Sequence, residues 1–209
     1  MIKIAYNTLR LVRPRQWIKN IAIFAAITFS GDLFDTSILQ KVFLAFVVFC
    51  SLSSASYIIN DIVDIKKDKL HPFKRFRPLA NKDLTVTYAL GVAFALIVFS
   101  FILGLMVNPA FFIIGAVYLT IQFFYSTVLK PIAIIDILAI ALGYILRVYA
   151  GELAGGVHIS VWLLLTTISL SLFLAIGKRR SELTLVSQNK AVNISDVRKT
   201  LSHYSERLL

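Results

Sequence analysis

Cysteine and acidic residues are scarce in this sequence. The 209 residues include one cysteine, Cys50, so the chain cannot form an internal disulfide, and its position in an apolar stretch indicates inert packing. Only 11 Asp and Glu stand against 22 Lys and Arg, which gives a formal net charge of +11. Charged residues make up 16% of the chain, whereas 58% of it is hydrophobic. This composition excludes an ordinary soluble domain and indicates several membrane spans.

Long apolar runs separated by polar connections predict the fold. Each run approaches the length of about 20 residues that a helix needs to cross the hydrocarbon core. We therefore expect an all-α, polytopic membrane helical bundle with six spans, at residues 20–37, 41–59, 85–106, 110–129, 132–150 and 160–177. The predicted organisation is a basic N-terminal segment at 1–19, a transmembrane bundle at 20–177 with a motif loop at 60–84, and a polar, amphipathic tail at 178–209.

Lysine and arginine are distributed unevenly among the connections. The N-terminal segment, the 60–84 loop and the tail hold most of them, whereas the connections at 31–40, 107–109 and 151–159 hold none. The positive-inside rule therefore places the first group in the cytoplasm. Because the basic residues flank membrane spans, we expect anionic headgroups or a phosphorylated substrate as partners, and no nucleic acid.

The stretch NDIVDIKKD extends the second apolar run into an acidic cluster. In a continuing helix, Asp61, Asp64 and Asp68 lie at i, i+3 and i+7 on one face, with Asn60 at its edge. Carboxylate oxygens at a membrane mouth favour a hard cation, so we expect the three aspartates to bind Mg²⁺, which typically shares itself with substrate phosphates. The alternative is a solvated charged loop, with the acids neutralised by Lys66, Lys67 and Lys69.

Basic residues follow in the same loop. Lys74, Arg75 and Arg77 can bind phosphate oxygens, and arginine can do so in bidentate geometry. Pro72 and Pro78 interrupt regular helix and shape the loop. The loop therefore predicts a diphosphate site in which Mg²⁺ and these cations share the phosphate oxygens.

A second polar cluster lies near the fifth span. Tyr125 and Lys130 fall at a predicted cytoplasmic turn, Asp136 lies just inside the span, and Arg147 lies about three turns deeper. Ionisable residues inside a span are costly and usually face the bundle interior with a function or a partner. We expect Asp136 to face the first cluster. For Arg147, a structural ion pair with Glu152 or another acid is the alternative to substrate binding.

These motifs carry a family resemblance over nearly the whole chain from Arg13 onward. NDIVDIKKD resembles the asparagine–aspartate motif of the UbiA-like intramembrane prenyltransferase superfamily, and YSTVLKPIAIID resembles the start of its second motif. The chain is most similar to the decaprenyl-phosphate phosphoribosyltransferase branch, through RPRQWIKN, NDIVDIKKDKLHPFKRFRPLA, YSTVLKPIAIIDILAIALGYILRVYAGELAGG and LFLAIGKRRSEL.

The resemblance implies a reaction and a site. The branch transfers 5-phosphoribose from phosphoribosyl diphosphate to a polyprenyl phosphate with Mg²⁺, on the cytoplasmic face of a prokaryotic membrane, and can feed cell-wall synthesis. The implied catalytic residues are Asp61, Asp64 and Asp136, with Asp61, Asp64 and Asp68 holding the metal. The implied substrate-binding residues are Asn60, Lys19, Lys74, Arg75, Arg77, Tyr125, Lys130 and Arg147.

Two departures from the superfamily pattern leave alternatives open. The second motif often has two aspartates four residues apart, whereas Ile140 stands where the second would follow Asp136. The superfamily has nine spans, so a chain of six is expected to be C-terminally truncated by about three helices. The alternative functions are prenyl transfer from a diphosphate to an aromatic or other acceptor, and a transporter that uses the acids as an ion site. The oligomeric state stays open.

Overall fold

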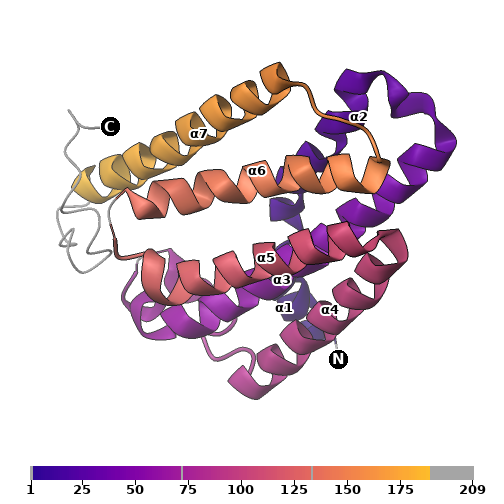
Figure 1. The fold of residues 1–209 in the computed structure, drawn as a ribbon. Helices are drawn as coiled ribbons and strands as arrows, with labels where there is room; N and C mark the ends of the chain where they lie inside the picture. Colours follow the sequence, from indigo (N-terminus) through magenta and orange to yellow (C-terminus); the bar gives the residue numbers. More distant parts are fainter. Residues whose placement is uncertain (1, 72, 133, 189–209) are drawn as a thin grey trace.

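Every regular element of the described chain is helical. The computed structural model describes residues 2–71, 73–132 and 134–188, and the predicted amphipathic end of the tail lies outside them. The all-α class is confirmed (Figure 1). The elements are α1 (Ile2–Val12), η1 (Pro14–Phe24), α2 (Ala25–Ser30), η2 (Asp32–Phe34), α3 (Thr36–Leu70), η3 (Lys74–Phe76), α4 (Val86–Val107), α5 (Pro109–Phe124), η4 (Tyr125–Leu129), α6 (Ile135–Gly155) and α7 (Val161–Gln188).

Helix α3 joins the second predicted span and the acidic motif in one element. Its N-cap is Asp35, whose carboxylate accepts hydrogen bonds from the backbone N–H groups of Ser37 at 2.8 Å and Ile38 at 3.1 Å. The helix continues to Leu70 and ends where His71 turns to an extended conformation. The acidic motif is therefore helical, as expected, and its three aspartates have fixed positions on α3.

Five helices are long and apolar enough to span a membrane: α3, α4, Pro109–Leu129, α6 and Val161–Ser181. The expected span at 20–37 is wrong as a continuous helix. There the chain forms the 3₁₀ helix η1, the short helix α2 and the turn η2. Backbone geometry explains the end of α2, because Gly31 has a positive φ of 91°, which ends a right-handed helix; Arg13, with φ of 57°, separates α1 from η1 before the expected span begins.

Helices α3 and α6 form the inside of the bundle. Of an apolar stretch of 18 residues in each helix, 67% is buried inside the protein in α3 and 56% in α6, compared with 17% in α4 and 11% in α7. The core packs Phe49 and Leu52 of α3 against Phe111 and Tyr118 of α5 and Leu146 of α6. The outer helices instead leave apolar side chains exposed, as expected of surfaces that face lipid.

A close backbone contact fixes α6 against η1. A Cβ atom built on Gly151 would lie 1.8 Å from the carbonyl oxygen of Ile23, so only glycine allows the two elements to approach so closely. Four residues further, a Cβ atom on Gly155 would lie 3.0 Å from Ile27 Cγ2 of α2, which is a contact with a side chain and not with backbone. This contact sets the register between α6, which carries Arg147, and η1, which carries Lys19.

The predicted site segments gather at one end of the bundle. In Figure 1 the end of α3, the connection from α5 to α6 and the end of α7 all lie on the left. Ion pairs from α3 to Lys130 and from α6 to Arg179 of α7 support this arrangement. The two pairs join residues that are 66 and 43 positions apart in sequence. We call the end of the bundle where these segments meet the polar mouth.

Candidate active site

The three aspartates of α3 are buried at the polar mouth. Asp61, Asp64 and Asp68 are 2%, 5% and 4% exposed. Buried carboxylates need counter-charges, because an isolated one would lose its hydration without replacement. Each of the three pairs with a basic residue outside α3, so the alternative of a solvated loop neutralised by Lys66, Lys67 and Lys69 is not what the structure gives.

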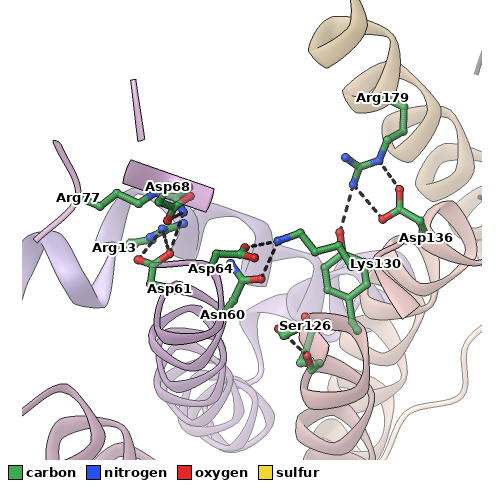
Figure 2. A network of polar contacts seen from close by, with 12 residues as sticks. Arg13, Asn60, Asp61, Asp64, Asp68, Arg77, Ser126, Lys130, Asp136 and Arg179 are labelled. Carbon is green, nitrogen blue, oxygen red and sulfur yellow. Dashed lines mark hydrogen bonds and ion pairs between the residues drawn. The ribbon is translucent and has the colours of Figure 1, made fainter. Parts of the chain in front are cut away.

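Arg77 lies between two of these carboxylates. Its Nη1 atom donates to Asp61 Oδ1 at 3.0 Å and to Asp68 Oδ2 at 2.6 Å (Figure 2). Arg13 adds a second guanidinium, whose Nη2 lies 2.5 and 2.7 Å from the two oxygens of Asp61. Arg13 was not among the predicted site residues, although it begins the RPRQWIKN motif. Its left-handed backbone conformation, sparsely populated for a residue with a side chain, turns the chain from α1 into η1.

Asp64 forms its ion pair with a different basic residue, Lys130. Its Oδ2 pairs with Lys130 Nζ, which also lies 3.4 Å from Asn60 Oδ1 (Figure 2). Lys130 directly follows the π-helical turn η4, and its backbone N–H donates to Tyr125 O. A π-turn widens the helix end and changes the direction of the residue after it. The structure thus brings Asn60, Asp64 and Lys130 together; their roles in a substrate or metal site stay a prediction.

Asp136 is paired with a residue that sequence reasoning missed. Its Oδ2 lies 2.6 Å from Arg179 Nε, and both side chains are 0% exposed. Arg179 Nη2 also donates to Asp136 Oδ1 at 3.3 Å and to Tyr125 Oη at 3.2 Å. This pair joins α6, α7 and the start of η4. The ion pair of Asp136 is with Arg179, and the expectation that Asp136 faces the aspartates of α3 stays a prediction.

The neighbouring basic residues of the loop are placed differently from Arg77. The Arg75 guanidinium lies 4.8 Å from the centre of the Phe76 ring, and Arg75 is exposed. Lys74 begins the short helix η3, where its backbone N–H approaches His71 Nδ1 at 3.3 Å. Of the three predicted phosphate-binding cations in this loop, Arg77 is therefore the one that the described contacts attach to the acids.

Arg147 lies deeper, among neutral partners. Its Nε donates to Asn20 Oδ1 at 2.7 Å, Nη1 to the Gly143 carbonyl at 2.6 Å and Nη2 to Tyr118 Oη at 2.9 Å. Arg147 is 4% exposed and has no carboxylate partner within the part of the chain that the structure describes. The alternative of an ion pair with Glu152 is wrong for these residues, because Glu152 approaches His158 instead, at 3.6 Å.

Lys19 lies between the mouth and Arg147. Its ammonium is 5.9 Å from the centre of the Tyr57 ring, and the Arg13 guanidinium is 5.4 Å from the same ring. Burial is the main cause that lowers the pKa of Lys19 below its usual value; Tyr144 acts in the opposite direction, and the charges of Arg147 and Arg13 lower the pKa further. Lys19, Arg147 and Asn20 thus form a cationic region that holds no acid among the described residues. We call it the inner basic region.

The carboxylates of the mouth are the kind of ligand that a hard divalent cation prefers, but they do not form a preformed metal site. No group of three or more His, Cys, Asp or Glu in the described ranges is close enough to hold a metal together. Two carboxylates, Asp61 and Asp68, nevertheless converge on one cationic nitrogen, that of Arg77. Mg²⁺ commonly binds one or two carboxylates and completes its shell with water and substrate phosphates. That Asp64 completes one site with them stays a prediction.

The fold and these residues define an integral membrane protein with a charge-paired polar site at one end of a helical bundle. Residues 20–180 match the model of the UbiA prenyltransferase family, and the chain belongs to that family.

The relatives include decaprenyl-phosphate phosphoribosyltransferases. The Mycolicibacterium smegmatis protein of that name is 38% identical over 96% of this chain, and that of Corynebacterium glutamicum is 37% identical over 99%. The chain spans 63% and 62% of the length of these two relatives. A solved UbiA homologue from Archaeoglobus fulgidus, bound to GPP and Mg²⁺, superposes with a TM-score of 0.79 at 22% identity, over 97% of this chain and 71% of that one.

Proposed function

We propose that this chain carries the donor site of a polyprenyl-phosphate phosphoribosyltransferase. It would transfer 5-phosphoribose from phosphoribosyl diphosphate to a polyprenyl phosphate with the help of Mg²⁺. The observation that carries the proposal is the mouth itself, where three buried aspartates meet Arg13, Arg77 and Lys130. Relatives of that name at 37–38% identity support the choice of substrate.

The residues of the mouth can serve the donor. The carboxylates of Asp61, Asp64 and Asp68 would hold Mg²⁺, which when bound supplies positive charge for the leaving diphosphate. Arg77 and Lys130 offer donors for the remaining phosphate oxygens, as arginine and lysine do in other phosphate sites. Asp136, buried against Arg179, would act by holding the η4 region that carries Lys130, so its catalytic role would be indirect.

The chemistry requires little from a base. The bond between the anomeric carbon and the diphosphate oxygen breaks, and a bond from that carbon to a phosphate oxygen of the lipid forms. The attacking oxygen is already ionised at neutral pH, so no proton has to be removed. Cations positioned before the reaction stabilise the charge that develops on the leaving group. The site needs preorganised positive charge, which the mouth has, rather than a histidine.

The inner basic region suits the acceptor. Lys19 and Arg147 lie deeper in the bundle than the aspartates and have no acidic partner among the described residues. A buried cation without a counter-charge favours an anionic ligand, because the ligand replaces lost hydration. The phosphate of a membrane lipid can reach such a site from the bilayer, whereas the water-soluble donor arrives at the cytoplasmic mouth. This division supports two separate phosphate sites.

Prenyl transfer is the second candidate. It is supported by the family name and by the Archaeoglobus fulgidus homologue bound to GPP and Mg²⁺. Membranes that contain this chain should be incubated with labelled phosphoribosyl diphosphate or with labelled prenyl diphosphate, and the lipid extracted. We expect the ribosyl label in lipid, and its loss in Asp64→Ala. Incorporation of the prenyl label alone into product would select the second candidate.

A further inference from the structure

The Arg77 guanidinium takes the place between two carboxylates that a bridging metal would need. Its Nη1 contacts Asp61 Oδ1 and Asp68 Oδ2 at 3.0 and 2.6 Å. Oxygen ligands approach Mg²⁺ at about 2.0–2.1 Å, so an ion that joined these two oxygens would overlap the guanidinium nitrogen. Arg77 and a metal that bridges Asp61 and Asp68 therefore exclude each other.

Asp68 depends on this contact more than Asp61 does. Asp61 also receives two hydrogen bonds from Arg13, whereas Arg77 is the one basic partner of Asp68 within the described ranges. Withdrawal of Arg77 would leave Asp68 buried and negative, and a metal ion would restore its counter-charge. The two cations are thus alternatives for one carboxylate pair.

Arg77 can withdraw without unfolding its loop. The residues that follow it are anchored, because Leu79 and Leu84 pack in a core cluster with Leu11 and Ile58. The backbone before it is held by Arg10, which donates to the Phe76 carbonyl at 2.7 Å. The Arg77 side chain itself is 23% exposed, so rotation about its own bonds moves the guanidinium toward solvent.

We propose that Arg77 is displaced from Asp61 and Asp68 by the divalent cation, and that the released guanidinium then binds the donor. The inference rests on the proposed metal site and goes beyond it, because it gives one residue two opposite effects. Arg77 lowers the affinity for metal in the absence of donor and raises the affinity for donor once metal is bound. A residue that only binds phosphate would show the second effect alone.

Direct metal binding tests the first effect without turnover. Mn²⁺, which shares the oxygen ligands of Mg²⁺, is titrated into the purified chain in detergent without substrates, and free Mn²⁺ is followed by electron paramagnetic resonance. We expect Arg77→Gln to bind Mn²⁺ at least about tenfold more tightly than wild type, because the two charge-assisted hydrogen bonds of Arg77 to Asp61 and Asp68 no longer compete with the metal. Arg75→Gln is the matched control, because it removes the same charge from the same loop without a described contact to the acids. We expect a change of less than about threefold for this control.

The outcomes separate this inference from the proposed function. Equal tightening in both variants would mean a general effect of loop charge and would overturn the exchange. Weaker binding in Arg77→Gln would overturn it as well. Absence of Mn²⁺ binding in wild type and both variants would overturn the metal site and the exchange together. Tightening confined to Arg77→Gln, with no transfer of ribosyl label in wild type, would support the exchange and count against the proposed substrate.

Chemical modification gives a second readout on the unaltered chain. Phenylglyoxal modifies accessible arginines, and mass spectrometry reports each site. If metal displaces Arg77, its rate of modification should increase several-fold with Mg²⁺, while that of exposed Arg75 stays constant. A decrease at Arg77, or equal rates with and without metal, would show that the guanidinium remains at the acids and would overturn the exchange.

Discussion

Replacing Gly151 by alanine should separate two elements that both carry candidate site residues. The new Cβ would lie 1.8 Å from Ile23 O and 2.8 Å from Ile23 C. Ordinary contact begins at 3.4 Å, so α6 or η1 must move by more than 1 Å. The obstacle is backbone and Ile23 is fully buried, so no side-chain rotation can relieve the clash. Overpacking of a well-packed interior costs about 1–3 kcal/mol, and a backbone clash belongs at the upper end.

The same displacement should reach the inner basic region. Arg147 lies one turn before Gly151 on α6, and its Nε–Asn20 Oδ1 bond of 2.7 Å joins α6 to η1. A shift of more than 1 Å at Gly151 takes this bond beyond hydrogen-bonding distance. We therefore expect Gly151→Ala to lose stability and also affinity for the lipid acceptor, although the residue touches neither substrate.

The single cysteine supplies the assay. Cys50 is 5% exposed, so a thiol-reactive dye reports unfolding of the purified chain in detergent. For a loss of about 3 kcal/mol we expect Tm to fall by about 6–12 °C. Gly91→Ala is the control, because its Cβ meets nothing within 4 Å, and Gly155→Ala, which meets only side-chain atoms, should fall between the two. Equal Tm values for Gly151→Ala and Gly91→Ala would refute the close approach of α6 and η1.

Three further predictions follow from the charges. Arg179→Ala should cost about 3–5 kcal/mol because it leaves the buried Asp136 unpaired, whereas the double variant with leucine at both positions should lose less, and thermal unfolding of all variants measures the coupling. Lys19→Met should raise Tm at neutral pH while lowering ribosyl transfer. Since the folded pKa of Lys19 is lowered, wild-type stability rises with pH between that pKa and about 10.4, so the gain in Tm should shrink across this window. Finally, cysteines at positions Lys69 and Asn108 should be labelled from opposite sides of the membrane, and labelling of both from one side would contradict the orientation inferred from the positive-inside rule.

Local patterns predicted the acidic face of the site. Asp61, Asp64 and Asp68 share a face because their spacing follows helical periodicity, and the structure keeps that helix to Leu70. The apolar runs predicted six spans, and five of them correspond to helices long and apolar enough to cross a membrane. The failure at 20–37 also has a local cause: the positive φ of Gly31 ends α2 inside the expected span, which hydropathy alone does not detect.

Partners from distant segments could not be predicted. Arg179 reaches Asp136 across the packing of α7 on α6, and the basic run GKRR gave no sign of which arginine is buried. Arg13 reaches Asp61 through the turn between α1 and η1. For Arg147 an acidic partner was the alternative to substrate binding, yet its hydrogen-bond partners are an amide, a carbonyl and a phenol, which no charge pattern reveals.

The contrast between the two charged regions bears on the order of binding. At the mouth, the described cations and carboxylates already neutralise one another without a ligand. A ligand that binds there must therefore replace an existing ion-pair partner. In the inner basic region, Lys19 and Arg147 make no ion pair with a carboxylate in the described ranges, and the hydrogen-bond partners of Arg147 are neutral. An anion gains most where no internal competitor has to be displaced. We infer that the lipid phosphate can bind the inner region without metal, whereas the donor diphosphate needs the metal to open the mouth, so lipid affinity should be independent of Mg²⁺ and donor affinity should not.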